Sequence, residues 1–341
     1  MPSITTILTQ FFPPPAPLTE STLPSQAGKV FIITGGSSGV GLELSRILYQ
    51  AGGTVYCMSH HPGRGLAAIE KIKNTVNTRS ERVSPQGTLH FIPLDLADLS
   101  TIAPAINLFL ARETRLDVLF NNAGRASIPL DYKTVQGHEP HFGINCAGTW
   151  LVTHLLTPLL CSTANISPQN TIRITWTASV LVDLMAPPGG VTISNLRTPT
   201  TNLHEHYSAS KAGNYFLASE WHRRFGGSGV ISLALNPGSL KTNTWRSTPW
   251  YHYWPYYFFL GEALDGARTN LWAAFEKGIT REDGGRYVVP RGRWHEDLRP
   301  DVVVGLKGKE EGGTGRACEV WEWCEEVTRP FWGGEGVVGL E

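Results

Sequence analysis

A buried strand that leads through a glycine-rich turn into a helix is the feature that most constrains the fold of this chain. Residues 30–33 form a continuous apolar run with two isoleucines, which is typical of a parallel strand buried on both faces. The next eight residues read TGGSSGVG (34–41), and residues 41–51 follow with apolar side chains near helical spacing. Glycines in such a turn permit a tight bend and let a pyrophosphate approach the backbone, while the helix N-terminus offers free N–H groups. A mere tight turn is the alternative.

The alternation of strand and helix continues along the chain. Further strands are expected at 54–58, 89–94, 116–120, 172–177, 230–235 and 286–289, and helices at 66–76, 99–111, 142–160, 205–225 and 262–276. Repeated βα units imply a parallel sheet covered by helices on both faces. The expected fold class is therefore α/β, a doubly wound parallel sheet of Rossmann type in a single domain.

We expect this catalytic domain to span residues 29–290, between an N-terminal arm (1–28) and a C-terminal extension (291–341). The arm is expected to pack on the surface. The extension carries enough aromatic side chains to dock back onto the domain. Within it, residues 305–316 are rich in Gly, Lys and Glu, and we expect them to form a flexible surface loop.

Composition and charge exclude several classes of protein. The 29 Lys and Arg side chains balance the 29 Asp and Glu side chains, so a general attraction to nucleic acid or an anionic membrane is not indicated. No basic residue precedes Lys29, as a signal peptide would require, and no apolar run approaches the roughly 20 residues that span a bilayer. We expect no integral membrane segment.

The cysteines and histidines show no metal-binding pattern. None of the five cysteines forms a CxxC pair, and the 11 histidines lack zinc-ligand spacing. We expect no metal and no disulfide framework, with the cysteines as small buried hydrophobes. A reducing compartment, and hence a cytoplasmic location, fits this pattern best.

Tyr207 and Lys211 stand four residues apart on an expected helix and therefore share one face. Carbonyl reduction needs a hydride donor and a proton donor for the developing alkoxide. A phenol with a pKa of about 10 is poorly matched to that task at neutral pH. A nearby ammonium lowers that pKa by stabilising the phenolate. An ordinary surface pair is the alternative for these two residues taken alone.

Ser179 follows the end of an expected strand, where a parallel sheet presents its ligand side. Its hydroxyl is placed to hydrogen-bond the oxygen of a substrate carbonyl. Thr177 is the nearest competitor for this role.

Jointly, these motifs resemble those of the short-chain dehydrogenases/reductases. The turn at 34–41 has the Gly-x-x-x-Gly-x-Gly spacing of that family, and further family marks follow in the right order. They are Asp95 in Leu94-Asp95-Leu96, the motif Asn121-Asn122-Ala123-Gly124, Asn145, Ser179, Tyr207-x-x-x-Lys211, and Pro237-Gly238 through Thr242. The resemblance covers residues 29–290.

Within the family, the C-terminal extension and the general sequence pattern resemble those of reductases of fungal secondary metabolism. The long gap between Ser179 and Tyr207 resembles the retinol-dehydrogenase-like branch. The chain departs from the usual Ser-Ser pair, because Ala178 precedes Ser179.

The resemblance implies a role for each of these residues. Tyr207 would be the proton donor or acceptor, Lys211 would also hold the nicotinamide ribose, and Ser179 would polarise the carbonyl. Asn145 would hold a water that links Lys211 to solvent, with a helix-kink asparagine as the alternative. Asp95 would contact the adenine ring. The cofactor-binding residues expected are Gly35, Ser37, Ser38, Gly39, Val40, Gly41, Ser59, His60, Arg64, Asp95, Leu96, Asn122, Ala123, Gly124, Tyr207, Lys211, Pro237, Gly238, Leu240 and Thr242.

The stretch 57–64 favours NADP(H) over NAD(H). An NAD enzyme usually carries Asp or Glu after the second strand to bind the ribose hydroxyls, and this stretch has no acid. Ser59 can donate a hydrogen bond, and Arg64 supplies a fixed positive charge suited to a phosphate. His60 stands where related reductases often carry Arg. Either His60 or His61 touches the 2′-phosphate, or both face solvent and Arg64 acts alone.

The expected function is NADP(H)-dependent interconversion of a carbonyl and an alcohol on a bulky, largely apolar small molecule, such as a secondary-metabolite intermediate. Residues 184–204 and 243–262 are expected to shape its pocket. The aromatic segment 250–260 would be a lid, a segment packed on the fold, or a membrane-surface contact. The alternatives are a catalytically silent NADP-sensing binding protein and a membrane-associated retinoid- or steroid-type dehydrogenase. The family also implies a homodimer paired through helices 142–160 and 205–225.

Overall fold

A twisted sheet of eight strands forms the centre of the molecule, in the order β3-β2-β1-β4-β5-β6-β7-β8. The computed structural model describes residues 2–77, 86–126, 128–129, 131–197, 202–241 and 260–333. The strands are β1 (Val30–Thr34), β2 (Thr54–Ser59), β3 (Thr88–Pro93), β4 (Val118–Asn121), β5 (Arg173–Thr177), β6 (Ile231–Leu235), β7 (Tyr287–Val289) and β8 (Arg293–Trp294). All neighbours are parallel except β7 and β8. The strand order reverses between β1 and β4, where open α/β sheets form a binding crevice.

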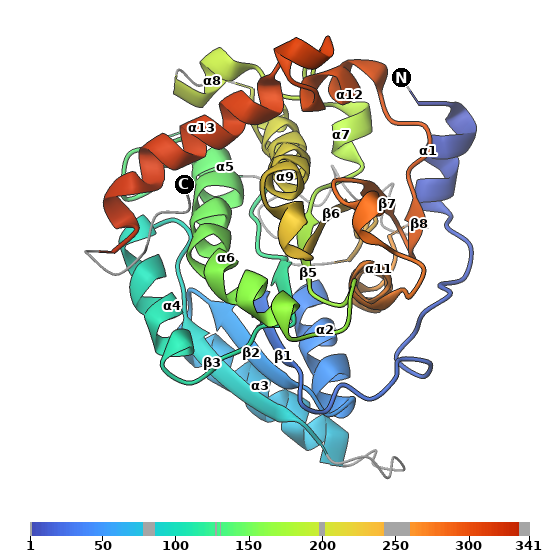
Figure 1. Cartoon of the computed structure of the whole chain (residues 1–341), viewed down its shortest axis with the longest axis vertical. Helices are drawn as coiled ribbons and strands as arrows, with labels where there is room; N and C mark the ends of the chain where they lie inside the picture. The colour runs from blue at the N-terminus through green and yellow to red at the C-terminus, as the bar shows by residue number, and fades with distance from the viewer. Residues whose placement is uncertain are drawn as a thin grey trace.

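Helices cover both faces of the sheet (Figure 1). They are α1 (Ile4–Phe11), α2 (Gly39–Gln50), α3 (Pro62–Asn77), α4 (Ile102–Leu110), α5 (Pro140–Phe142), α6 (Thr149–Asn165), α7 (Leu181–Leu184), α8 (Ile193–Arg197), α9 (Leu203–Phe225), α11 (Ala263–Phe275), α12 (Pro300–Leu306) and α13 (Arg316–Thr328). Short 3₁₀ turns include η1 (Leu99–Thr101) and η6 (Lys309–Glu311), and a π-turn, η2 (Gly143–Gly148), joins α5 to α6. The expected doubly wound α/β fold is confirmed.

The strand sequences are continuously apolar because each face of the sheet meets its own hydrophobic cluster. In β1, Ile32 packs in the cluster under α4, α6 and α9. Phe31 and Ile33 point the other way, into the cluster under α2 and α11. Every residue of β1, β5 and β6 is buried. Each strand expected from the sequence is present with ends that agree within two residues.

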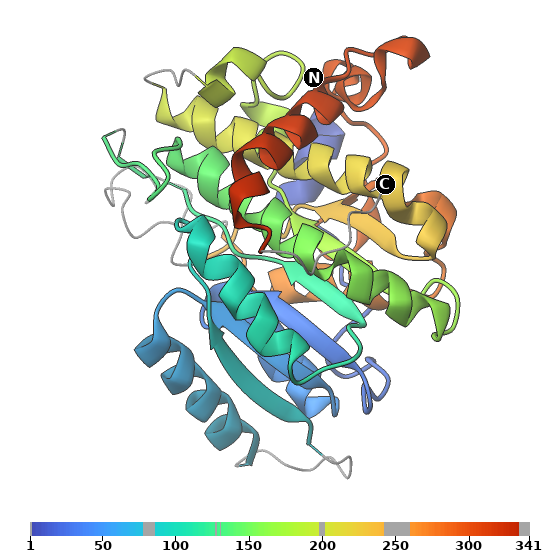
Figure 2. The same ribbon diagram turned by 60° about the vertical axis from the view of Figure 1, so that its left-hand side comes forward.

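The C-terminal extension docks across α6 and α9, as its aromatic content suggested. The ring of Trp321 in α13 lies 5.2 Å from that of Trp150 in α6 and 6.1 Å from that of Phe225 at the end of α9. Figure 2 shows α13 crossing these two helices. The family resemblance implied a homodimer through the same pair of helices. Helix α13 covers part of these helices, and the homodimer stays a prediction.

The loop predicted at 305–316 is confirmed for residues 307–315, which connect α12 to α13 and contain only the 3₁₀ turn η6; residues 305–306 end α12, and α13 begins at Arg316. The flexibility of this loop stays a prediction. Gly312 and Gly315 adopt φ angles of +76° and +72°, which other residues rarely adopt, so these glycines form the turns between helices.

One helical stretch among the described residues, Pro140–Asn165, is long and apolar enough to cross a membrane by length and composition. The expectation that no segment approaches this length is therefore wrong, because α5, η2 and α6 run together. In this structure 78% of its most apolar window is buried inside the fold. Trp150 and Leu151, for example, pack in the cluster under α4, α6 and α9.

Candidate active site

The glycine-rich turn joins β1 to α2 with little room for side chains. Gly35 adopts a φ of +69°, and its N–H donates to the carbonyl oxygen of Met58 at 2.7 Å. Ser38 is the N-cap residue of α2, but its side chain makes no capping hydrogen bond. The first N–H groups of α2 therefore have no side-chain cap. Such N–H groups, at the partly positive end of a helix, are suited to bind a phosphate. Ser37 and Gly39 belong to the same turn.

Asn122 closes this turn from the neighbouring strand. Its side-chain amide donates to the carbonyl oxygen of Thr34 at 2.9 Å. The backbone N–H groups of Asn122 and Ala123 both donate to Thr34 Oγ1 at 3.0 Å. A Cβ on Gly41 would collide with the carbonyl oxygen of Gly35 and lie 2.7 Å from Asn122 Nδ2. Glycine at 41 is thus dictated by the close approach of the helix, the turn and β4.

Three predicted cofactor-binding residues meet beside α11, although they come from distant segments. A Cβ on Gly266 would lie 2.5 Å from Leu240 Cδ1, 2.7 Å from Val40 Cγ2 and 3.3 Å from Pro237 Cβ. The loop after β6 is bent at Gly238, whose φ is +105°. Thr242, predicted to bind the cofactor, lies outside the described residues.

At the end of β2, Ser59 has a buried hydroxyl oxygen for which the described residues supply no hydrogen-bond partner. His60 and Arg64 are exposed next to it. Burial lowers the pKa of His60 below its usual value; Asp95 opposes this shift, and Arg64 and Arg125 add to it. The guanidinium groups of Arg64 and Arg125 thus lie close enough to the end of β2 to act on His60, as does the carboxylate of Asp95. Arg125 is not among the cofactor-binding residues expected from the sequence.

Asp95 and Leu96 line the turn after β3. The carboxylate of Asp95 accepts from the backbone N–H of Ala97 at 2.9 Å. Leu96 packs closely on the π-turn, since a Cβ on Gly148 would lie 3.0 Å from Leu96 Cβ.

Ser179, Tyr207 and Lys211 come together at the carboxyl end of β5. Tyr207 is half-buried on α9, close enough to the side chain of Ser179 for that side chain to lower its pKa. Lys211 Nζ lies 5.8 Å from the centre of the Tyr207 ring and donates to the carbonyl oxygen of Thr177 at 2.8 Å. Thr177, the alternative to Ser179 for binding the substrate carbonyl, thus contacts Lys211 through its backbone carbonyl oxygen, whereas the side chain of Ser179 lies beside Tyr207.

Burial dominates the ionisation of the tyrosine and the lysine. It raises the pKa of Tyr207 to about 12, against the opposing effect of the Ser179 hydrogen bond. It lowers the pKa of Lys211 to about 8. Burial is thus the largest influence on the pKa of Tyr207 in this structure, and Lys211 directs a hydrogen bond to the carbonyl oxygen of Thr177. The expected stabilisation of the phenolate by Lys211 stays a prediction.

Asn145 lies in the π-turn η2, a type of local distortion that is frequent at functional sites. Its Oδ1 accepts from the N–H of Arg125 at 2.9 Å, and its Nδ2 donates to the carbonyl oxygen of Arg125 at 3.1 Å and to Ser210 Oγ at 3.0 Å. A Cβ on Gly124 would lie 2.9 Å from Lys211 Nζ and 3.2 Å from Asn145 Oδ1. Glycine at 124 therefore leaves the space in which Lys211 and Asn145 meet.

Tyr287 of β7 fixes the backbone of Ser179, a contact that the sequence did not reveal. Its hydroxyl donates to the carbonyl oxygen of Ser179 at 2.8 Å, and the N–H of Ser179 donates back to it at 3.1 Å. No local motif marks Tyr287, because the contact spans 108 residues and arises only when β7 joins the sheet.

Comparisons with known proteins identify the family. The model of the short chain dehydrogenases matches residues 29–180. A short-chain dehydrogenase/reductase of Pestalotiopsis fici, iacJ, is 39% identical over 95% of this chain and 98% of its own. One from Phomopsis amygdali is 38% identical over 94% and 96%. This chain belongs to the short-chain dehydrogenase/reductase family. The predicted resemblance to fungal members of that family is confirmed.

Solved structures support the same fold. A protein from Mycobacterium paratuberculosis superposes with a TM-score of 0.65 at 26% identity, covering 92% of this chain and 97% of that chain. The RhlG/NADP complex of Pseudomonas aeruginosa has a TM-score of 0.58 at 20% identity, covering 79% and 96%. The second likeness concerns the fold alone. As a short-chain dehydrogenase/reductase, the chain is an oxidoreductase of a family that uses NAD(P)(H).

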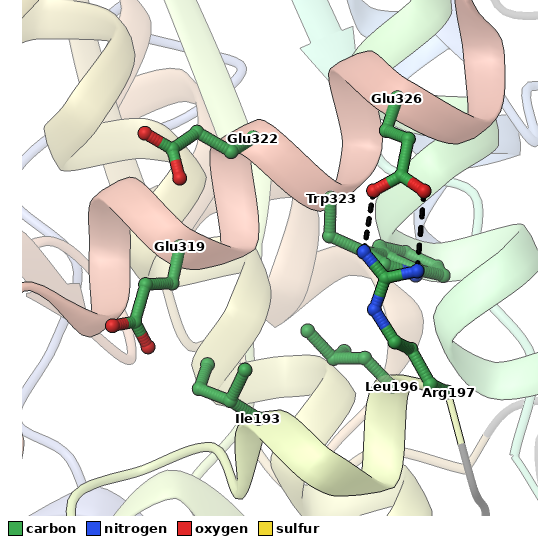
Figure 3. Close-up of a pocket in the computed structure, with 7 residues that line it drawn as sticks. All are labelled: Ile193, Leu196, Arg197, Glu319, Glu322, Trp323 and Glu326. Carbon is green, nitrogen blue, oxygen red and sulfur yellow. Dashed lines mark hydrogen bonds and ion pairs between the residues drawn. The ribbon is translucent and has the colours of Figure 1, made fainter.

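Two hollows in the described part of the molecule lie on its outer side rather than at the catalytic residues. One, of about 200 Å³, lies between α8 and α13 and is crossed by the ion pair of Arg197 and Glu326 (Figure 3). None of the predicted catalytic or cofactor-binding residues lines either hollow, but Ile193, Leu196 and Arg197 of the expected pocket segment 184–204 line the second. Of the expected pocket segments, 198–201 and 243–259 lie outside the described residues, and these include nearly all of the aromatic segment 250–260. Within the described ranges, no group of three or more His, Cys, Asp or Glu side chains forms a metal site.

We predict that Gly41→Ala lowers the free energy of unfolding by about 1–3 kcal/mol and weakens binding of the cofactor, because the new methyl group displaces Gly35 or Asn122. Denaturant unfolding and titration with NADPH measure the two effects. Gly227→Ala is the matched control, since a Cβ there meets nothing within 4 Å. Wild-type stability and affinity in Gly41→Ala would show that the turn tolerates a side chain.

Proposed function

We propose that this protein is an NADP(H)-dependent oxidoreductase that interconverts a carbonyl group and an alcohol on a bulky, largely apolar small molecule. The observation that carries the proposal is the meeting of Ser179, Tyr207 and Lys211 beside the switch point of the sheet. A hydroxyl that can polarise a carbonyl, a phenol that can give up a proton and a buried ammonium are the groups that such a reaction needs.

The bound nicotinamide would supply or accept the hydride, and the side chains of the chain would handle the oxygen and its proton. Ser179 would donate a hydrogen bond to the carbonyl oxygen of the substrate. As the carbonyl carbon gains the hydride, the oxygen becomes an alkoxide and takes the proton of the Tyr207 hydroxyl. The charged Lys211 beside the ring would stabilise the phenolate that remains. In the oxidative direction each transfer runs backwards.

The residues around the turn fit a dinucleotide. The start of α2, which has no side-chain cap, and the tight turn that Gly35 and Gly41 permit suit a pyrophosphate. The unpartnered hydroxyl of Ser59 is positioned where the ribose of an adenosine would lie in this fold. Arg64 and Arg125 favour the additional phosphate of NADP over the bare ribose of NAD.

Two observations support the proposed substrate class. The chain is similar to fungal members of the family over almost its whole length. The segment 250–260 contains two tryptophans, four tyrosines and two phenylalanines among its eleven residues. A secondary-metabolite intermediate with an apolar ring system has the chemistry that such aromatic side chains bind well. We propose it as the substrate class, with a cytoplasmic location for the enzyme.

We expect Tyr207→Phe to lower kcat by about a hundredfold or more, because only the proton donor is removed. Binding of NADPH, measured by fluorescence titration, should remain close to that of the wild type. Tyr215→Phe removes a hydroxyl from the same helix and should keep its kcat. A panel of carbonyl compounds with NADPH provides the assay. A folded Tyr207→Phe protein with near-normal kcat would refute the assigned role and with it the proposed function.

The pH profile of the wild-type enzyme should report on Lys211. Because burial lowers the pKa of Lys211 to about 8, its positive charge is present below that pH and is lost above it. We therefore expect kcat/KM for carbonyl reduction to fall as the pH rises through about 8. Lys73→Ala, on the surface of α3, should show the same profile. A profile that stays flat to about pH 10 would contradict a role for the charged lysine.

Cofactor preference should depend on Arg64 and Arg125. We expect kcat/KM to favour NADPH over NADH, and either alanine substitution to reduce the ratio by about tenfold. Since the pKa of His60 lies below its usual value, this side chain gains its charge only below about pH 6.5. The ratio should thus stay nearly constant from about pH 8 to 6.5 and rise in more acidic solution.

Arg112→Ala, which removes an exposed charge after α4, is the control. A ratio that favours NADH would overturn the cofactor assignment. A ratio that favours NADPH but does not rise in acid would remove His60 from the phosphate site and leave the arginines.

A further inference from the structure

The N-terminal helix α1 has an unusual distribution of side chains. It buries the polar Gln10, which is 3% exposed, while the apolar Ile4 and Leu8 are 78% and 51% exposed. Burial of an uncharged amide is costly unless its donor and acceptor are both satisfied. The contacts of Gln10 therefore show what holds α1 in place.

Gln10 bridges two segments that are far apart in the sequence. Its Nε2 donates to Asp183 Oδ2 at 2.8 Å. Its Oε1 accepts from Asn236 Nδ2, also at 2.8 Å. Asp183 and Asn236 are themselves buried, so water does not compete for these hydrogen bonds.

Both partners of Gln10 belong to segments that carry the proposed site. Asp183 lies in α7, the single turn that follows Ser179, and the N–H of Leu181 in that turn donates to Ser179 Oγ at 3.2 Å. Asn236 follows β6, and its Oδ1 accepts from the N–H of Gly238 at 3.0 Å. A continuous series of hydrogen bonds thus runs from the loop after β6 through Gln10 to the turn after β5.

The C-terminal extension supports the same turn from another side. His295 Nε2 lies 2.7 Å from Asp183 Oδ2, and its ring lies 5.7 Å from that of Tyr287, which fixes the backbone of Ser179. The carboxylate of Asp183 is therefore held by one residue from each terminal segment.

We propose that Gln10 is a positioning residue. It fixes the turn that bears Ser179 and the loop Asn236–Leu240 relative to each other, so that α1 contributes to the geometry of the active site. The inference rests on the proposed function, because it assumes that Ser179 meets the substrate and that the loop contacts the cofactor. Gln10 touches neither and acts through Asp183 and Asn236.

The chemistry of the bridge requires an amide. One side chain must donate to a carboxylate and accept from an amide at the same time, and glutamine carries both groups at its tip. Methionine has a similar size but would leave Asp183 and Asn236 without these hydrogen bonds. Glutamate would keep the acceptor but place a second carboxylate against Asp183 at neutral pH.

The first test compares Gln10→Met with Thr6→Val in the full-length chain. Thr6 is the matched control, because its hydroxyl donates to Asp297 Oδ2 at 3.1 Å and so also tethers α1, but away from the bridge. We expect Gln10→Met to raise the Kd for NADPH by about tenfold, to lower kcat and to speed amide exchange at Gly238. Thr6→Val should leave all three measurements near their wild-type values.

A purely structural role would give a different result. The proposal is overturned if Gln10→Met lowers only the Tm while Kd, kcat and the exchange rate at Gly238 stay unchanged. It is equally overturned if Thr6→Val has the same effects as Gln10→Met.

Gln10→Glu provides a second test should Gln10→Met fail to fold. A protonated glutamate can donate to Asp183 as glutamine does, whereas the carboxylate repels it. The Kd of Gln10→Glu for NADPH should therefore approach that of the wild type as the pH falls toward about 5, where the neighbouring charge helps to keep the glutamate protonated. A gap between the two proteins that does not change with pH would refute the bridge.

The two proposals can fail separately. If the wild-type protein reduces no carbonyl compound, the proposed function fails. Amide exchange at Gly238 needs no ligand, so it still decides whether Gln10 orders the loop.

Discussion

The contact between Thr34 and Asn122 at the switch point is the constraint on which the rest of the site depends. Thr34 ends β1, Asn122 follows β4, and three hydrogen bonds tie the two strand ends together. The chain can cross this junction only where side chains are missing, which explains the glycines at 35 and 41. The same junction directs the N-terminus of α2, which has no side-chain cap, toward the crevice. It also brings the segment Asn122–Gly124 beside Lys211.

The buried lysine is the second constraint. An ammonium that is almost completely removed from water needs fixed acceptors, and the carbonyl oxygen of Thr177 provides one. Its pKa nevertheless falls to about 8, which leaves it mostly charged near neutral pH. Burial moves the pKa of Tyr207 in the opposite sense, to about 12. The two side chains thus keep their protons at neutral pH, the state from which Tyr207 can act as a proton donor.

The fold and most of the site were predictable from the sequence because their signals are local. A continuous apolar run marks a doubly buried strand, and Tyr207 and Lys211 share a helix face by spacing alone. Contacts made across the sheet leave no such signal. Tyr287 contacts Ser179 only after β7 pairs with β6. Arg125 comes close to His60, at the end of β2, only because the turn after β4 brings it there. The helices α12 and α13 were not predicted, because the Gly-rich, charged stretch between them is typical of a loop and masks the short helices on either side.

The terminal segments show why a domain boundary drawn from sequence can mislead about function. Residues before 29 and after 290 lie outside the alternating strand and helix pattern. The sequence therefore predicts that they are extensions of a domain that is complete without them. In the structure they meet each other, through the hydrogen bonds of Ser3 and Thr6 to Asp297. They also meet at Asp183, which accepts from Gln10 and contacts His295. A parallel sheet leaves the loops at its carboxyl edge attached only at their ends. Additional segments packed under those loops supply the fixed geometry that hydride and proton transfer demand, because such reactions tolerate little misplacement of the reacting groups.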